Sequence, residues 1–387
     1  MFQDKYVFAQ LASFLNRSKF NRIVTKYDGD KYVKHFTCWN QLLALMFGQL
    51  SNRESLRDLI VALEAHHSKC YHLGMGKMYQ SHRWQEQIKI ETITSLKNML
   101  TTWLAKHDKS VLIIFSNLAV TFMLSIRQLL TCAFQSFGGQ NSAKKKGGIK
   151  VHTLYDVETQ IPAFFHITEA SVHDSKVMIE IPYEPSSYYI FDRGYNNFKM
   201  LYKIHQIEAY FVVRAKKNLQ YKSIQWKRRL PKNVLSDASV LLTGFYPKQY
   251  YPKPLRLVKY WDEEQEREFT FITNAMHISA LQVAELYKNR WQVELFFKWL
   301  KQHLKIKRFW GTTENAVRIQ IYAAICAYCL VAIIQHDMQL DRSTYEVLQI
   351  LSISLTDKTH LRDLFDKTKF QNDKERFGPN GPSLFNF

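Results

Sequence analysis

Apolar positions recur from the N-terminus at the three- and four-residue spacing of amphipathic helices. An apolar segment over residues 39–50 predicts one helix, and a periodic segment that starts at Leu56 predicts another. Ser51 and Glu54 precede the second helix at the spacing of a capping box. We therefore expect a small all-α domain over residues 1–77, which serves either to bind DNA or as a packing module.

From residue 144 the pattern changes to short apolar runs of strand length that alternate with helical segments. The expected strands are 150–156, 161–167, 188–191 and 209–214, and the expected helices are 174–181 and 196–205. This alternation predicts an α/β fold with a mixed sheet flanked by helices. Residues 215–275 are β-rich, with a hairpin around the charged turn DEEQERE, and residues 279–336 are helical.

The charge of the chain indicates a polyanionic partner. Lys and Arg total 53 against 34 Asp and Glu, which gives a net charge of +19. Nucleic acid is the first candidate and an anionic membrane surface the second. The longest apolar run in the pattern, Val111–Leu124, is interrupted at Ser116 and Asn117 and is shorter than the roughly 20 residues of a spanning helix. With no signal-peptide pattern and five cysteines, we expect a reducing, cytosolic location.

A basic segment provides a candidate nucleic-acid contact within the β-rich region. Aromatic side chains at Tyr221 and Trp226 alternate with its cations, which suits phosphate contacts combined with base stacking. The alternative is a solvated basic loop. The cations are Lys216, Lys217, Lys222, Lys227, Arg228, Arg229 and Lys232.

Two groups of cysteine and histidine residues have simpler explanations than a metal site. His66, His67, Cys70 and His72 lie close together, but no second half-site with zinc-finger spacing follows. Cys326 and Cys329 form a lone CxxC in an apolar helix, which is typical of buried core cysteines. The chain also lacks the GxxxxGK[ST], GxSxG and HExxH motifs.

Four polar residues near the C-terminal third are spaced as if on one helix face. Tyr287, Arg290, Glu294 and Lys301 fall within an arc of about 60° at 100° per residue, beside the apolar face. A carboxylate flanked by two cations and a phenol suits metal and phosphate chemistry. An amphipathic helix with i,i+4 charge pairs would produce the same spacing.

A second carboxylate, Asp192, directly follows the apolar run YYIF and precedes a turn that contains Gly194. Open α/β sheets place catalytic groups at such strand ends, although a turn-forming aspartate is the alternative. Asp192 and Glu294 together suggest a site in which carboxylates hold two metal ions roughly 4 Å apart for phosphodiester chemistry.

These residues match a known family. Tyr287-x2-Arg290-x3-Glu294-x6-Lys301 resembles in full the YREK signature of DDE transposases of the insertion-sequence-4 type. FDRGY around Asp192 is similar to the second-aspartate motif of that family, and GGIKVHTLYD and IPAFFHITEASVHD resemble two of its strand blocks.

The resemblance implies an RNase H-like core over residues 144–336, with the β-rich insertion between the two carboxylates and a C-terminal tail over 337–387. Asp192 and Glu294 would be the catalytic metal ligands for Mg²⁺ (or Mn²⁺). Tyr287, Arg290 and Lys301 would contact DNA phosphates. The implied activity is cut-and-paste transposition at terminal inverted repeats, by a homodimer acting on transposon ends and target DNA. The implied location is the nucleoid in a bacterial cytoplasm.

One required element is missing. The family carries a first aspartate in a motif like YAFDSTT shortly before the GGIK block, but residues 78–143 contain only Asp108, in the unsuitable context AKHDKSV. This window also lacks a clear predicted strand that ends in an acid. We therefore expect little or no transposase activity.

A reading-frame shift would explain the gap. Codons that start at the third base of the written codons allow Phe122–Lys144 to be read as YAFDSTTIDLCLSVFWWAKFRK. The recovered aspartate straddles the codons of Ser125 and Ile126. Our hypothesis is that residues from about Met78 to Ala143 are out of frame and replace the first catalytic strand. The alternative is a genuinely divergent segment, and resequencing of the gene across these codons decides between them.

Two other functions fit the same sequence. A non-catalytic protein that occupies transposon ends and represses transposition needs only the basic segment. A general RNase H-like nuclease would cut without end specificity, and the YREK spacing argues against it.

Overall fold

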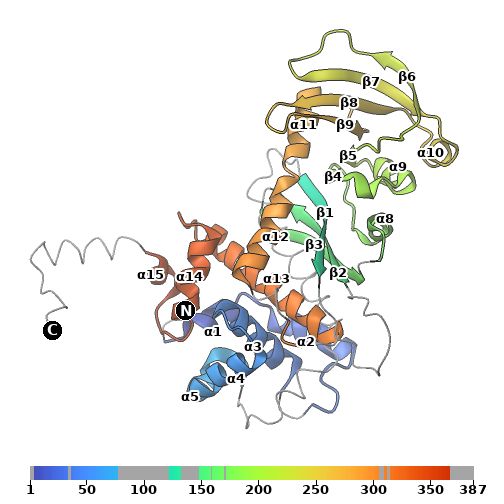
Figure 1. Cartoon of the computed structure of the whole chain (residues 1–387). Coiled ribbons are helices and arrows are strands. Elements are labelled where there is room, and N and C mark those ends of the chain that lie inside the picture. The colour runs from blue at the N-terminus through green and yellow to red at the C-terminus, as the bar shows by residue number, and fades with distance from the viewer. Residues whose placement is uncertain are drawn as a thin grey trace, which may run out of the picture. The chain divides into compact units, whose positions relative to one another are not determined.

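The computed structural model describes residues 4–33, 36–76, 122–131, 148–157, 159–169, 171–304, 309–311 and 314–366 (Figure 1). The chain divides into two compact units. The first unit combines residues 1–100 with residues 300–387, and the second spans residues 101–299. Each unit is described separately below.

The first unit is helical. Its central helix, α3, is buried at every position, and a helix that is apolar all round is stable only inside a core. Helix α13 packs against α3 and α14. Gly48 of α3 permits the close approach of Trp310, which precedes α13, because a Cβ there would lie 2.7 Å from Cη2 of Trp310. The helices are α1 (Val7–Ala12), α2 (Arg17–Lys26), α3 (Cys38–Leu50), α4 (Leu56–Ala65), α5 (His67–Cys70), the π-helical turn Tyr71–Met75, α13 (Glu314–Asp337), α14 (Thr344–Ser354) and α15 (Leu361–Phe365).

Both ends of the chain build this unit. The backbone N–H groups of Val7 and Phe8 donate to carbonyls between α14 and α15, at distances of 2.8 and 3.0 Å. The Gln10 amide donates to the Thr359 carbonyl at 2.8 Å and accepts from the Leu361 N–H at 3.0 Å. Residues 337–366 are therefore part of a packed domain, whereas the sequence predicted a tail. Short polar loops precede α14 and α15 and interrupt the apolar pattern, so helical periodicity did not predict these two helices.

The N-cap of α4 differs from the sequence prediction. Ser55, and not Ser51, caps this helix, because its hydroxyl accepts from the Asp58 N–H. Ser51 instead ends α3 and donates to the Phe47 carbonyl at 2.7 Å. The left-handed conformation of Asn52, with a φ of 61°, redirects the chain between the two helices. The predicted capping box was therefore placed four residues too early.

One helix among the described residues is long and apolar enough to cross a membrane. It is the Ala316–Asp337 part of α13, and 94% of its apolar window is buried inside the fold, as in the core helix of a packed domain. The sequence argument singled out Val111–Leu124 instead. Residues 111–121 of that run lie outside the described part of the chain, and the rest begins strand β1.

The second unit is built on one nine-stranded mixed sheet with the strand order β3-β2-β1-β4-β5-β9-β8-β7-β6. Strand β1 is parallel to β4, and β4 is parallel to β5, whereas all other neighbours are antiparallel. The strands are β1 (Phe122–Thr131), β2 (Gly148–Asp156), β3 (Pro162–Glu169), β4 (Tyr188–Phe191), β5 (Tyr210–Arg214), β6 (Tyr221–Trp226), β7 (Val234–Leu242), β8 (Leu255–Asp262) and β9 (Arg267–Thr273).

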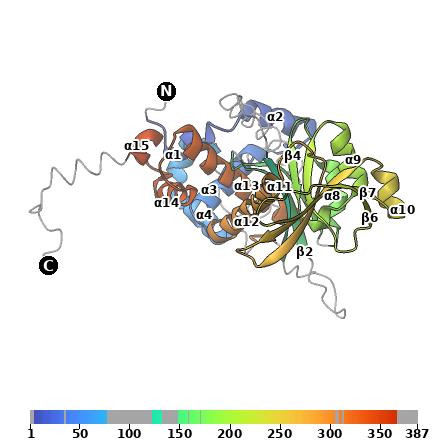
Figure 2. The same ribbon diagram turned by 90° about the horizontal axis from the view of Figure 1, so that it is seen from above.

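Helices cover the two faces of the first five strands (Figures 1 and 2). Helices α8 (Asp174–Val177) and α9 (Phe198–Gln206) lie on one face, and α11 (Ala280–Lys288) and α12 (Trp291–His303) lie on the other. Phe191 of β4 belongs to the apolar core with α9, whereas Tyr155 of β2 packs on Phe296 of α12 at 5.2 Å between ring centroids. Because side chains alternate along a strand, even positions of β2 face α8 and odd positions face α12.

Strand β1 fills a place where the sequence predicted no clear strand. Its backbone pairs with β2 from Met123 to Thr131 and with β4 from Phe122 to Ser125. A strand ladder uses backbone groups, so a chain without proline can complete it regardless of side chains. The sheet is therefore continuous from β2 through β1 to β4 in the described residues. Residues 78–121 and 132–143 of the window proposed to be out of frame lie outside them.

The β-rich insertion continues the same sheet. Strands β6 to β9 and the short helix α10 (Phe245–Tyr250) follow β5, and β9 returns beside β5 with Val212 opposite Thr273. Strand β6 forms the outer edge, and its side chains are mostly exposed. The insertion therefore extends the platform that carries Asp192 without interrupting it.

Candidate active site and nucleic-acid interface

Asp192 lies at the carboxyl end of β4, as the sequence predicted from YYIF. The strand is buried at all four positions and ends at Phe191, and the turn Arg193–Tyr195 follows at once. Phe191 faces the core on the α9 side, so the next residue emerges on the α11 side. The half-buried carboxylate of Asp192 therefore lies on the face of the sheet that α11 and α12 cover.

Tyr287 of α11 meets this carboxylate. Its hydroxyl donates to Oδ1 of Asp192 at 3.2 Å. The ring packs on Phe271 of β9, with 4.7 Å between centroids. Burial and then the charge of Asp192 raise the pKa of Tyr287 well above its ordinary value, so the phenol stays protonated and remains a donor.

The helix that carries the four-residue signature is broken. Helix α11 ends at Lys288 and α12 begins at Trp291, whereas the spacing predicted one continuous helix. Hydrogen bonds between residues three apart close the junction, from the Arg290 N–H to the Tyr287 carbonyl at 3.1 Å and from the Val293 N–H to the Arg290 carbonyl at 3.3 Å. Tyr287 and Glu294 therefore lie on two consecutive helices that this tight turn joins.

Arg290 lies at that turn and connects the two helices. Its guanidinium lies 5.7 Å above the Tyr287 ring and forms an ion pair with Oε1 of Glu294 at 2.8 Å. Asp192, Tyr287, Arg290 and Glu294 thus form a continuous series of contacts. Lys301 lies farther along α12, in the part that clusters with the helical unit, so its position relative to Asp192 is not defined.

A cationic cavity of about 510 Å³ adjoins this series of contacts. Arg214 and Arg267 both lie over the Phe269 ring, at 4.8 and 4.4 Å from its centroid. Burial is the main cause that lowers the pKa of Arg214. Lys288, Arg290 and the exposed Trp291 complete the basic and aromatic wall, and Asp262, Glu264 and Gln265 of the β8–β9 turn line another part of it. Guanidinium groups beside aromatic rings suit phosphate and base contacts.

Sequence analysis missed the contribution of Arg214, Arg267, Phe269 and Trp291 to this cavity. Arg214 ends the predicted strand AYFVVR, so its place at a strand end was an available signal. Arg267 and Phe269 lie in a hairpin that pairs back onto β5 through β9. Only that long-range pairing brings them beside Tyr287.

The basic segment is exposed, as expected for a contact surface. Lys216 and Lys217 lie in the turn before β6, and Arg228 and Arg229 follow β6. Trp226 is 63% exposed beside them. Lys227 has a structural partner, because its Nζ lies 3.2 Å from Oδ2 of buried Asp237.

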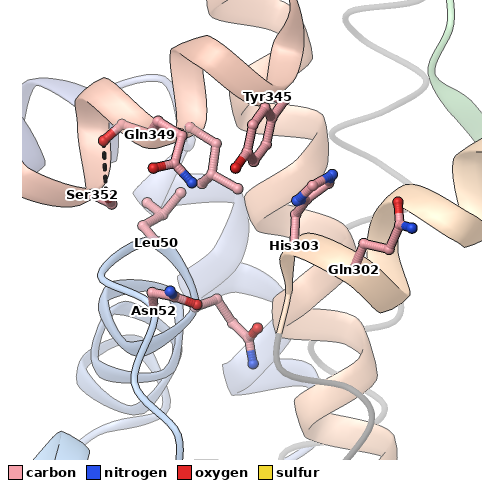
Figure 3. Close-up of a pocket in the computed structure, with 9 residues that line it drawn as sticks. Leu50, Asn52, Gln302, His303, Tyr345, Gln349 and Ser352 are labelled. Carbon is pink, nitrogen blue, oxygen red and sulfur yellow. Dashed lines mark hydrogen bonds between the residues drawn. The ribbon is translucent and has the colours of Figure 1, made fainter.

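A second cavity, of about 190 Å³, lies in the helical unit (Figure 3). Uncharged polar groups dominate its lining, and the rings of His303 and Tyr345 are 4.2 Å apart. None of the predicted site residues lines it. The lining residues are Gln49, Leu50, Asn52, Gln302, His303, Tyr345, Leu348, Gln349 and Ser352.

The described residues do not fit a two-metal site. Across the described part of the chain, no group of three or more His, Cys, Asp or Glu side chains could hold a metal ion. Asp192 accepts from Tyr287, and Glu294 is paired with Arg290. Near His66, the Cys70 thiol donates to the Leu63 and His66 carbonyls, and burial raises its pKa to about 11. A thiol in this state is a poor metal ligand.

The contact between Tyr287 and Asp192 predicts that the stability of the folded chain falls at alkaline pH. Because the pKa of Tyr287 is raised in the folded chain, its contribution to stability is full below the ordinary tyrosine pKa of about 10 and is lost as the pH rises further. Tyr287→Phe should cost about 1–2 kcal/mol at pH 8 and less at pH 10.5. Urea unfolding at both pH values measures this. Tyr260→Phe is a control in the same cavity and should lose as much stability between pH 8 and pH 10.5 as the wild type does. An equal loss of stability in the wild type, Tyr287→Phe and Tyr260→Phe would contradict the role given to Tyr287.

Comparison with known proteins identifies the family. The transposase DDE domain model matches residues 126–330, which is more than half of the 387 residues, and a domain of unknown function (DUF4372) matches residues 3–76. The chain belongs to the DDE transposase domain family. That family implies an RNase H-like core, and the mixed sheet with parallel strands β1, β4 and β5 agrees with it. DDE transposase domains depend in general on divalent metal ions.

Curated relatives are named as transposases, two of them for insertion sequence elements. "Putative transposase y4zB" of Sinorhizobium fredii is 36% identical over 232 residues, which cover 57% of this chain and 63% of the relative. "Probable transposase for insertion sequence element IS5377" of Geobacillus stearothermophilus is 31% identical, over 48% of this chain and 49% of the relative. "Putative transposase for insertion sequence element IS4SA" of Synechocystis sp. is 26% identical, over 54% and 60%. The matches thus span between half and two thirds of these relatives.

A solved structure of the piggyBac transposase synaptic complex with hairpin DNA matches with a TM-score of 0.46 and 12% identity. The match covers 98% of this chain and 84% of that chain.

Proposed function

We propose that the chain is a DNA transposase of the insertion-sequence-4 type by descent, built for cut-and-paste movement of an insertion sequence. The observation that carries this proposal is the direct contact between Asp192 at the end of β4 and Tyr287 at the start of the four-residue signature. Two segments that lie 95 residues apart in sequence meet at one strand end. Family membership supports the reaction class, strand cleavage and transfer at phosphodiester bonds.

In this proposal Asp192 and Glu294 are the surviving metal ligands, for Mg²⁺ or Mn²⁺, and Tyr287, Arg290 and Lys301 contact phosphate. The cationic cavity around Arg214 and Arg267 supports a polyanionic ligand at this face. The missing group is the first carboxylate of the triad. We infer that this copy binds end DNA and cleaves it weakly or not at all.

A second function follows from that deficit. A chain that keeps its basic surfaces but lacks one carboxylate is suited to occupy transposon ends without cutting them, and so to repress transposition. Residues 78–143 contain a single aspartate, Asp108, in a context unlike the first-aspartate motif that the resemblance implies. This observation favours the repressor function over an active nuclease.

A cleavage assay on labelled end DNA separates these functions. Purified full-length chain is incubated with a duplex that carries the terminal repeat and with a scrambled duplex, in buffer that contains MgCl₂ or MnCl₂. Retardation of the end duplex without cleavage supports the repressor. Substantial metal-dependent cleavage at the end would overturn our inference of a defective copy. Cleavage of both duplexes alike would favour a general nuclease.

The basic segment should account for part of the salt dependence of binding. Lys217→Gln/Arg228→Gln/Arg229→Gln should reduce the slope of log K against log salt by up to about 0.9 for each phosphate that the variant no longer neutralises. Lys176→Gln/Lys199→Gln/Lys203→Gln removes the same charge from exposed positions on the α8–α9 side and should leave the slope near wild type. Fluorescence anisotropy across a salt series measures both. Equal slopes for the two variants would show that the basic segment is a solvated loop.

Further parts of the proposal rest on resemblance. The N-terminal helices belong to one unit with residues 300–387 and are not a domain by themselves. We propose that the chain acts as a homodimer on transposon ends and target DNA, and that it works at the nucleoid in a bacterial cytoplasm. The match of a distinct domain family to residues 3–76 supports a boundary between sequence families near residue 77. The net charge of +19 supports a DNA partner.

A further inference from the structure

The turn that follows β4 is fixed on the side opposite Tyr287. Within the turn, the Tyr195 N–H donates to the Asp192 carbonyl at 3.0 Å. The Asn196 side-chain amide donates to the carbonyls of Arg193 and Arg214, both at 2.8 Å. These bonds define the backbone of the turn and tie it to the end of β5. Groups from β2 and α8 provide a second constraint.

A buried ion pair lies directly against the turn. Nζ of Lys150 on β2 is 3.1 Å from Oδ1 of Asp174 on α8, and both side chains are at most 5% exposed. Lys150 also donates to the Val172 carbonyl. The other carboxylate oxygen of Asp174 lies 2.8 Å from the place that a Cβ on Gly194 would occupy. Only glycine therefore allows the turn to approach Asp174 this closely.

A buried histidine holds the next residue of the turn. The two ring nitrogens of His152 lie 3.3 Å from the Tyr195 hydroxyl and 3.0 Å from Oγ1 of Thr168. Tyr195 is fully buried, and its ring packs on Phe191 at 5.7 Å. Lys150 and His152 are both even positions of β2, so they reach the turn from the α8 face. Asp192 reaches Tyr287 on the other face.

We propose that Lys150, Asp174 and His152 are positioning residues that hold the β4 turn so that Asp192 points at Tyr287. The inference rests on the proposed function only for the role of Asp192. Burial of an ion pair is a costly way to stabilise a core, because apolar side chains of similar volume often serve as well or better. The ion pair and the bond from Lys150 to the Val172 carbonyl do hold the Asp174 carboxylate in one place, and the backbone at Gly194 packs directly against it. Asp174 packs against Gly194, which is two residues from Asp192, so a shift of this carboxylate would also move Asp192.

The same arrangement gives a role to two sequence blocks that the active-site residues left unexplained. Lys150 and His152 belong to GGIKVHTLYD, and Asp174 ends IPAFFHITEASVHD. Both blocks converge on the FDRGY turn through side chains that do not touch Asp192. The three blocks therefore act as one unit around the end of β4.

A fluorine label at position 287 tests the proposal without DNA or metal. Tyr287 is replaced by 3-fluorotyrosine in the full chain, and the ¹⁹F resonance is recorded in the wild-type, Asp192→Asn and Lys150→Met backgrounds. Asp192→Asn marks the resonance of a weakened contact. We expect Lys150→Met and Asp174→Asn to move the signal most of the way to that position, and Lys150→Arg to restore much of the wild-type signal. Tyr251→Phe, which removes the hydrogen bond between Tyr251 and His205 of α9 in the same unit, should leave the signal unchanged.

A signal that stays at the wild-type position in both folded variants would overturn the proposal. So would an equal shift in Tyr251→Phe, because it would show a general loss of stability. If Lys150→Met does not fold, Gly194→Ala is the second variant, since its methyl group forces the turn and the Asp174 carboxylate apart. Hydrogen exchange of peptides over 188–200 provides the matching measurement. Because neither readout requires cleavage, failure of the proposed transposase function leaves this result interpretable.

Discussion

An Ile126→Asp variant should gain divalent-metal affinity over the natural chain. In the parallel pair of β1 and β4, Ser125 lies opposite Phe191, so position 126 falls one step further, beside Asp192. On the other side, Ile126 is paired with Thr153 of β2. Directly paired residues share a face, so position 126 is on the face of Tyr155, Asp192 and α12. A carboxylate there would be the third of the site.

The neighbour on β2 suits that change. Oγ1 of Thr153 is buried and has no hydrogen-bond partner among the described residues. An unmade hydrogen bond of this kind costs about 1–3 kcal/mol, and a carboxylate opposite it supplies an acceptor. The position also agrees with the shifted reading frame, in which the recovered aspartate straddles the codons of Ser125 and Ile126.

Thermal unfolding with and without MnCl₂ or MgCl₂ measures the gain. A cation at 100 times its dissociation constant stabilises the folded chain by about 2.7 kcal/mol, which raises Tm by roughly 5–10 °C in a domain of this size. Ser125→Asp is the matched control, because position 125 falls on the other face with Phe191 and Leu154. It should lower stability and show no metal response. A metal response of Ser125→Asp alone would contradict the register argument.

Loss of Asp237 should be the most destabilising single change in the insertion. Its carboxylate accepts two hydrogen bonds from Arg256, from Nε to Oδ1 and from Nη2 to Oδ2, both at 2.7 Å. Arg256 also donates to the carbonyls of Ala275 and Ile278 before α11. Asp237→Ala leaves a buried guanidinium without its counter-ion, which costs about 3–5 kcal/mol. Urea unfolding followed by circular dichroism measures that loss.

The ion pair between Asp237 and Arg256 also predicts that the stability of the folded chain falls at low pH. Burial acts to raise the pKa of Asp237, but the hydrogen bonds and charge of Arg256, followed by Lys227, outweigh it and lower the pKa below its ordinary value. The stabilisation is therefore full above the ordinary aspartate pKa of about 4 and is lost as the pH falls through the lowered pKa. Lys227→Met removes only the exposed partner and should cost less than about 1 kcal/mol. If Lys227→Met lost as much stability as Asp237→Ala, Lys227 and not Arg256 would be the main partner of Asp237.

The sequence predicted those parts of the fold that depend on local pattern. The run YYIF marks β4 at its observed bounds, because four buried apolar residues before a glycine turn have few other solutions. Asp192 followed from its place at that strand end. The hairpin of β8 and β9 was evident from its charged turn.

Other parts depend on pairings that no local pattern reveals. Arg214 and Arg267 converge only because β9 returns to β5, across about fifty residues of insertion. The break between α11 and α12 at Asn289 and Arg290 is invisible to a 100° period, because one tight turn barely alters the spacing. The capping of α4 by Ser55 was missed because Ser51 offered the same chemistry four residues earlier.

Because both chain ends contribute to one helical unit, this unit can complete its folding only after the sheet unit has been synthesised. Helix α3 is apolar on every side, yet α13, which covers it, leaves the ribosome only after the whole sheet unit has been made. At about 5–20 residues per second, the N-terminal helices wait on the order of ten to fifty seconds for that partner. The N-terminal helices are thus among the last elements to finish folding. Until then it depends on chaperones or on the growing sheet domain to keep its apolar surface from aggregation.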